Sequence, residues 1–147
     1  MEADGLFVYG PLREGGHEHA WLARTMPQGT CAAWTAGRLF HLPAEGSAAL
    51  VPRTEPDAAP PGPGWVTGEF IGYEGEEELE AALADLDQLQ GVAEERFVRR
   101  VLPVLLDSGL RYHAWTYIFE PDRLPRLERH ALELPDGDWS PYLDRRD

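Results

Sequence analysis

Apolar and polar residues follow one another in short runs along most of this chain, which is the pattern of a protein rich in strands. A buried strand is predicted where Leu6, Phe7 and Val8 stand together. Further runs rich in β-branched, aromatic and aliphatic residues predict strands at 30–42 (as one strand or two), 48–52, 66–73, 96–106 and 110–119. The last two runs flank Asp107-Ser108-Gly109, which is typical of a hairpin turn.

Residues 74–90 have the clearest helical pattern. Acidic side chains crowd the start, where the helix dipole favours negative charge. Leu79, Leu83 and Leu86 form an apolar stripe, and Gly91 is a typical stop. A shorter helix is predicted at 17–25. Several strands with one long helix and hairpin connections predict an α+β fold, built as a small curved sheet or barrel.

Gln90 is the polar residue that breaks the helical pattern. Advancing by about 100° per residue from Leu79 places position 90 about 20° away, on the apolar stripe. A buried amide needs hydrogen-bond partners. Two interpretations follow: the last turn frays and Gln90 reaches solvent or caps the last carbonyls, or Gln90 points into a cavity beside the sheet.

The first predicted strand runs into a glycine turn, Tyr9-Gly10-Pro11-Leu12-Arg13, followed by Gly15-Gly16. Such a turn brings backbone N–H groups and a cation together at the end of a strand, where they can hold a carboxylate. Two interpretations of Arg13 stay open, pairing with a ligand carboxylate or with an acidic residue of the chain. Tyr9 likewise either hydrogen-bonds within a pocket or packs beside it.

Composition narrows the classes of function. The chain has 147 residues, the length of a single domain, so one domain over residues 1–147 is expected. The net charge is −13, from 26 acidic and 13 basic residues, which argues against nucleic acid and anionic membranes as partners. With no run long enough to span a bilayer and no signal-like start, a cytoplasmic location is expected.

Several kinds of chemistry are also excluded or disfavoured. Every basic side chain is arginine, so lysine Schiff-base chemistry is excluded, and Cys31 is the only cysteine. His17 and His19 stand two residues apart, on different faces of a helix, so no metal site is expected there. No Gly-x-Ser-x-Gly elbow is present.

Taken together, the motifs resemble those of the γ-glutamylcyclotransferase family. The carrying segments are Phe7-Val8-Tyr9-Gly10-Pro11-Leu12-Arg13, Val66-Thr67-Gly68-Glu69-Phe70, Leu86-Asp87-Gln88-Leu89-Gln90-Gly91, Arg96-Phe97-Val98-Arg99-Arg100 and Ala114-Trp115-Thr116-Tyr117. The Gly137-Asp138-Trp139 tail is similar to that of small bacterial members. The resemblance implies a small mixed β-barrel with flanking helices.

The resemblance also implies an activity that needs no cofactor. A γ-glutamyl amine or amide would cyclise to 5-oxoproline and release its amine. Tyr9, Gly10, Pro11, Leu12, Arg13 and Tyr117 would bind the substrate, and position 90 would carry the catalytic glutamate. The expected partner is a small molecule with a γ-glutamyl or carboxylate group.

This chain departs from the family pattern in two places. Pro11 stands where the family usually has a hydroxyl residue, and proline has no N–H to donate. Gln90 stands where the general base belongs, and the loss of a base typically costs about 10²–10⁴-fold in rate. Glu69, Glu94 and Glu95 are the candidate substitutes. The alternative is a binding module without catalysis, in which the Gln90 amide recognises the ligand.

Overall fold

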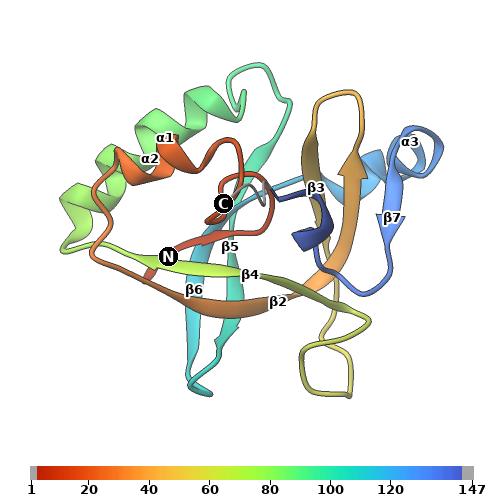
Figure 1. Cartoon of the computed structure of the whole chain (residues 1–147), viewed down its shortest axis with the longest axis horizontal. Helices are drawn as coiled ribbons and strands as arrows, with labels where there is room; N and C mark the ends of the chain where they lie inside the picture. Colours follow the sequence, from red (N-terminus) through yellow and green to blue (C-terminus); the bar gives the residue numbers. More distant parts are fainter. Residues whose placement is uncertain (1–2, 144–147) are drawn as a thin grey trace.

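The fold is a closed β-barrel with helices packed on its outside. The computed structural model describes residues 3–143. Figure 1 shows α1 and α2 side by side over one flank of the barrel, with β3, β7 and α3 on the opposite side. The elements in chain order are β1 (Gly5–Val8), α1 (His19–Ala23), β2 (Gly29–Leu42), β3 (Ser47–Pro52), β4 (Trp65–Gly72), α2 (Glu76–Leu89), β5 (Val98–Leu106), β6 (Arg111–Ile118), the 3-10 helix η1 (Pro121–Arg123), α3 (Leu124–His130), β7 (Leu132–Leu134) and the 3-10 helix η2 (Ser140–Tyr142).

Five strands close the barrel in the order β2-β4-β1-β6-β5 and back to β2. All neighbours are antiparallel except β1 and β6, which run parallel, so the barrel is mixed. Closure comes from Ala33 and Trp34 of β2, which pair with Leu106 and Leu105 of β5. The predicted α+β class with a small mixed β-barrel and flanking helices is confirmed.

The long strand β2 belongs to two sheets. Its first half pairs with β4 inside the barrel, and its second half pairs with β3 and β7. The predicted run at 30–42 is therefore one strand, which leaves the barrel partway along. This arrangement brings β3 alongside the end of β6, where the Phe119 N–H donates to the Leu50 carbonyl at 2.9 Å.

The central strand β1 is apolar throughout because both of its faces are covered. Leu6 and Val8 pack with Leu79, Leu83 and Leu86 of α2. Phe7 on the other face packs inside the barrel with Val66 and Phe70 of β4. The predicted stripe of α2 is thus the face that covers β1, and β1 ends directly beneath the last turn of α2.

Helix boundaries follow the predicted signals with one difference. Glu76, Glu77 and Glu78 occupy the first turn of α2, and Gly91 has the left-handed φ of +67° that stops it. The shorter helix was predicted at 17–25 but forms only over His19–Ala23, because the residues before it make turns. Within the described residues, no helix is both long enough and apolar enough to span a membrane.

Gly68→Ala is expected to destabilise the barrel by about 1–3 kcal/mol, because overpacking in a rigid core costs this much. A Cβ atom at Gly68 would lie 2.2 Å from the Val8 carbonyl oxygen and 2.6 Å from the Phe7 ring. Chemical denaturation of the two proteins measures the difference. Gly29→Ala is the matched control, since a Cβ atom at Gly29 meets nothing within 4 Å. Equal losses in both variants would contradict this account.

Candidate functional site

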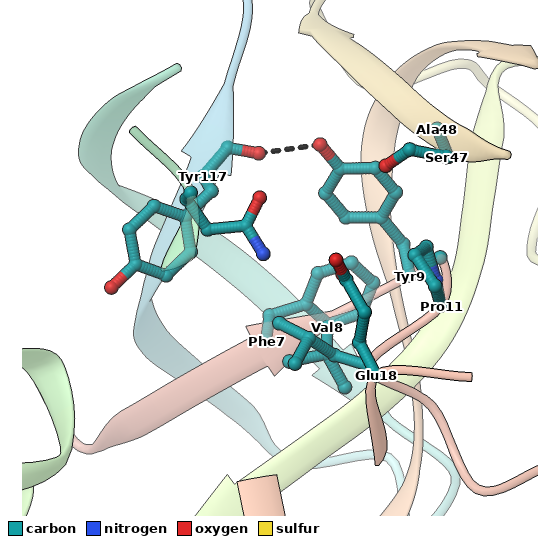
Figure 2. A pocket seen from close by; sticks show the side chains of 11 residues that line it. Phe7, Val8, Tyr9, Pro11, Glu18, Ser47, Ala48 and Tyr117 are labelled. Atoms are coloured by element: carbon teal, nitrogen blue, oxygen red, sulfur yellow. Dashed lines mark hydrogen bonds between the residues drawn. The ribbon is translucent and has the colours of Figure 1, made fainter. Parts of the chain in front are cut away.

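A narrow pocket lies between the loop that follows β1 and the end of α2. It holds about 310 Å³ of empty space, part of which is open to solvent. Figure 2 shows it from close by. The lining residues come from β1 and its loop, the start of β3, the end of α2 and β6: Phe7, Val8, Tyr9, Gly10, Pro11, Leu12, Glu18, Ser47, Ala48, Gln90 and Tyr117. The glycine turn and position 90, which are 80 residues apart in the sequence, therefore share one cavity.

Two glycines allow the loop to fold tightly against its neighbours. A Cβ atom at Gly10 would lie 2.9 Å from the Ala48 Cβ of β3, and one at Gly16 would lie 2.0 Å from the Pro11 carbonyl oxygen. The returning chain is held because the Glu18 N–H donates to that Pro11 carbonyl at 3.0 Å. The loop therefore doubles back and brings residue 18 to the pocket formed by residues 9–12.

The Tyr9 hydroxyl connects two strands at the wall of the pocket. It donates to the Tyr117 carbonyl of β6 at 2.5 Å and accepts from the Leu50 N–H of β3 at 3.2 Å. Burial raises the pKa of this phenol, although the Leu50 hydrogen bond opposes the rise. Tyr9 thus stays protonated. Its ring lines the pocket, while its hydroxyl hydrogen-bonds to backbone groups of β3 and β6.

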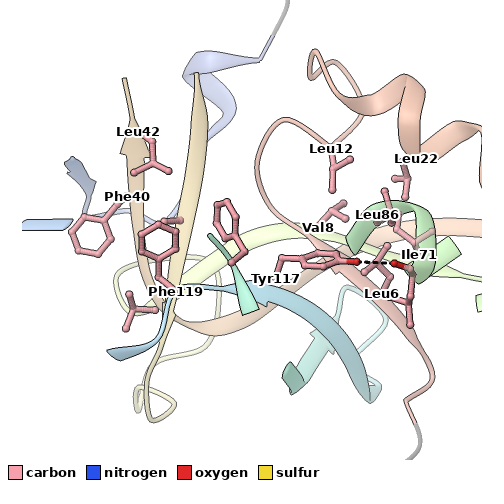
Figure 3. Packing of buried hydrophobic residues seen from close by; sticks show 14 of the residues in the cluster. Leu6, Val8, Leu12, Leu22, Phe40, Leu42, Ile71, Leu86, Tyr117 and Phe119 are labelled. Atoms are coloured by element: carbon pink, nitrogen blue, oxygen red, sulfur yellow. Dashed lines mark hydrogen bonds between the residues drawn. The ribbon is translucent and has the colours of Figure 1, made fainter. Parts of the chain in front are cut away.

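Tyr117 turns its phenol away from Glu18 and the pocket (Figure 2). Its hydroxyl donates to Asp87 Oδ1 at 2.7 Å, and the same carboxylate oxygen lies 3.0 Å from Nε of Arg99. Burial raises the pKa of Tyr117, and the Asp87 contact adds to the rise. Figure 3 shows the ring packed among Leu6, Val8 and Leu86. These contacts fix the end of α2, and hence position 90, against β6.

Gln90 occupies the C-cap position of α2, and its residue is only 7% exposed. The predicted position of Gln90 on the buried stripe is confirmed. Of the two interpretations, the structure agrees with the one in which Gln90 points into a cavity. It shares the pocket lining with Glu18. Burial raises the pKa of the Glu18 carboxyl group, and the nearby Gln90 amide opposes that rise. An amide from the helix and a carboxyl from the loop therefore meet across the pocket.

Glu18 is the site residue that sequence reasoning missed. In Figure 2 its side chain extends into the space between the Tyr9 ring and Tyr117. Its Oε1 atom is buried and has no hydrogen-bond partner among the described residues. In the sequence it is a glutamate between two histidines in a polar segment, with nothing to distinguish it from a solvated loop charge. The signal that could have found it is the Gly15-Gly16 pair, which marks a chain reversal.

The other predicted site residues lie outside the pocket lining. The Arg13 guanidinium forms an ion pair with Asp138 at 3.1 Å and lies 4.0 Å from Glu69. In this structure it therefore pairs with acidic residues of the chain, which was one of its two predicted interpretations. Glu69 accepts from the Glu14 N–H at 3.2 Å and lines a separate depression. Glu94 and Glu95 are exposed in the turns that follow α2.

The Arg13 contact ties the pocket loop to the C-terminal segment. Burial would raise the pKa of Asp138, but hydrogen bonds from Ser140 and the contact with Arg13 outweigh it, so the pKa is lowered. Asp138 is thus a stable anionic partner for Arg13. Arg13 holds the loop in place through this pair, and its predicted contact with a ligand stays a prediction.

Comparison with known proteins identifies the family of the chain. The sequence profile of the family described as gamma-glutamyl cyclotransferase, AIG2-like, matches residues 6–141. The chain belongs to this family. The match includes the barrel except Gly5, the first residue of β1, and all the pocket residues. No curated protein sequence matches the chain.

Solved structures of similar fold include one protein with an AIG2-like name and a bacterial protein, YkqA. An AIG2-like protein from Mus musculus is 18% identical, with a TM-score of 0.56 over 84% of this chain and 84% of that one. YkqA from Bacillus subtilis is 26% identical, with a TM-score of 0.61 over 96% of this chain. This cyclotransferase-family chain covers 41% of the length of YkqA.

The same fold also occurs in a differently named enzyme. Allophanate hydrolase from Kluyveromyces lactis is 15% identical, with a TM-score of 0.59 over 97% of this chain and 21% of that protein. Because one fold hosts several chemistries, the function of this family member depends on the residues of its pocket.

Proposed function

We propose that the pocket binds a γ-glutamyl group and promotes its cyclisation to 5-oxoproline with release of the amine. The observation that carries the proposal is the shared cavity of the Tyr9–Leu12 turn and Gln90. Membership of the γ-glutamylcyclotransferase family supports the type of reaction.

Backbone donors of the turn are suited to a glutamyl carbonyl or carboxylate. Within the described chain, the N–H groups of Gly10 and Leu12 donate to no protein acceptor. Such groups at a fixed turn can stabilise negative charge that develops on a carbonyl oxygen. Pro11 contributes no N–H, so the donors stand on either side of it.

Ring closure is intramolecular, so positioning supplies much of the rate. The α-amino nitrogen of the glutamyl group has to approach its own γ-carbonyl carbon, which requires a bent conformation. Well-oriented intramolecular reactions reach effective molarities of about 10⁵–10⁸ M. A narrow pocket with apolar walls, formed by Phe7, Val8 and Leu12, favours a compact bent ligand over an extended one.

The Gln90 amide can bind the substrate but has no useful basicity. It can donate to a carboxylate or accept from an ammonium group, which is recognition without proton transfer. A protein with recognition alone would be a binding module on the same fold. The two functions differ in whether the amide bond of the ligand is broken.

Release of 5-oxoproline from γ-glutamyl compounds tests the proposal. The panel should contain γ-glutamyl amino acids, γ-glutamyl alkylamines and γ-glutamyl-ε-lysine, with chromatographic detection of 5-oxoproline. We expect at least one compound to be converted faster than in buffer. Conversion of none, by protein shown to be folded, would contradict an enzymatic role, and calorimetric binding of the same compounds would then identify a binding module.

A further inference from the structure

The pocket holds one carboxyl group among the described residues, and it comes from the loop instead of the helix. Of its lining residues only Glu18 is acidic. The three substitutes suggested by sequence, Glu69, Glu94 and Glu95, are absent from the lining. A reaction in this cavity that needs a carboxylate has Glu18 to use.

The position of Glu18 is fixed by its backbone. Its N–H is held by the Pro11 carbonyl, and its own carbonyl accepts from the Trp21 N–H at 3.0 Å. The neighbouring His19 ring contacts the Leu12 carbonyl through Nδ1 at 3.0 Å. The carboxyl group is therefore presented from a chain anchored on both sides to the turn that lines the pocket.

The surroundings of the carboxyl group suit proton transfer. Burial raises the pKa of Glu18 above its usual 4.5. The charges of His17 and Arg96 and the Gln90 amide oppose this rise without cancelling it. Arg96 is itself paired with Glu45 at 2.7 Å, and the nearby Tyr9 phenol stays neutral. A carboxylate with a raised pKa is a stronger base than an exposed one and a proton donor closer to neutral pH.

We propose that Glu18 is the catalytic residue that transfers the proton during cyclisation, in place of a carboxylate at position 90. The proposal rests on the proposed function. It assigns Gln90 the role of holding the Glu18 carboxyl group and the substrate in place. An amide suits that role, because a second carboxylate so close would repel the first.

The proposed step balances in atoms and protons. The Glu18 carboxylate takes a proton from the α-ammonium group, and the freed nitrogen attacks the γ-carbonyl carbon to form the new C–N bond. The bond between that carbon and the departing nitrogen breaks. Glu18 passes this proton to the departing nitrogen and then relays the second proton, which the attacking nitrogen loses as it becomes the ring N–H. The departing group therefore leaves as an ammonium ion beside neutral 5-oxoproline, and Glu18 is again ionised.

Glu18→Gln in the full chain tests the assignment, with 5-oxoproline release as the assay and Glu14→Gln as the matched control. Glu14 lies on the same loop, and its side chain is exposed outside the pocket. We expect kcat to fall by about 10²–10⁴-fold in Glu18→Gln, the usual loss for a general base. The control is expected to stay within about twofold of the parent protein, as for surface substitutions away from special features.

Two further measurements separate a catalytic role from a structural one. The kcat/KM of the parent protein is expected to rise with pH as Glu18 loses its proton, at a pH above the ordinary pKa of a glutamate. Glu18→Asp keeps a carboxyl group and should show a similar rise of kcat/KM with pH. Near neutral pH, Glu18→Gln should melt at a higher temperature than the parent protein, because the fold disfavours the ionised carboxylate. That difference in melting temperature should vanish as the pH falls below the ordinary pKa of 4.5, because the Glu18 carboxyl group is then protonated in both the folded and the unfolded protein.

The outcomes distinguish the two proposals. If the parent protein releases 5-oxoproline and Glu18→Gln does so equally fast, the assignment to Glu18 is overturned and the proposed function stands. If the parent protein converts none of the compounds, both are overturned. A large loss of kcat in a stable Glu18→Gln variant, with the control unaffected, supports both.

Discussion

Replacing Trp139 by alanine is expected to lower the free energy of unfolding by about 3–5 kcal/mol, the usual cost of truncating a buried aromatic side chain. Trp139 is 1% exposed and packs in the cluster inside the barrel. Its indole N–H also donates to Nδ1 of His41 on β2 at 3.1 Å. For a protein of this size the melting temperature should fall by about 10 °C, as measured by calorimetry.

Trp21→Ala is the matched control for this prediction. Trp21 lies on α1 with 47% of its surface exposed, and its described contact is with the Arg24 guanidinium 5.0 Å from the ring centre. Such an exposed cation–π contact contributes about 0.5–1 kcal/mol. Similar losses for the two tryptophans would contradict the view that the C-terminal segment is anchored by Trp139.

The anchor of the tail also bears on the pocket. Asp138 precedes Trp139 and holds Arg13 of the pocket loop. Gly137 accepts from the Thr67 N–H of β4 at 2.8 Å, which places this segment over the barrel. Trp139→Ala should therefore loosen the loop as well as destabilise the fold. The variant is expected to lose affinity for any pocket ligand even at temperatures where it stays folded.

Most of the barrel was predictable because its signals are local. The apolar run of β1, the stripe and acidic start of α2, and the Asp107-Ser108-Gly109 turn each report on the residues that contain them. The double use of β2 was not predictable in this way. The point where it exchanges β4 for β3, between Ala36 and Gly37, depends on strands that lie elsewhere in the chain.

The residues of the candidate site also differ in whether local sequence patterns could place them. Gln90 could be placed by the helical period, since its orientation follows from Leu79, Leu83 and Leu86 on the same helix. Glu18 could not, because its orientation depends on the close approach of Gly16 to the Pro11 carbonyl. The ion-pair partner of Arg13 is Asp138, which lies 125 residues later in the sequence and so could not be inferred from a local pattern. Local patterns fix elements, whereas the site is assembled by contacts between distant segments.

Tyr9→Phe is expected to lower the free energy of unfolding by about 2–6 kcal/mol, because two buried backbone groups lose their partner at about 1–3 kcal/mol each. The Leu50 N–H and the Tyr117 carbonyl belong to different strands, β3 and β6. The Tyr9 hydroxyl connects them, with hydrogen bonds of 3.2 Å and 2.5 Å. Urea denaturation followed by tryptophan fluorescence measures the loss.

Tyr112→Phe is the matched control, because no hydrogen bond of the Tyr112 hydroxyl to a described residue is found and its ring packs edge-on against Phe70. A change of less than about 0.5 kcal/mol is expected for it. If the Tyr9 hydroxyl instead bound the substrate, Tyr9→Phe would leave stability unchanged and raise KM. The combination of a stability loss with an unchanged KM for the folded fraction would show that Tyr9 shapes the pocket wall without contacting the ligand through its hydroxyl.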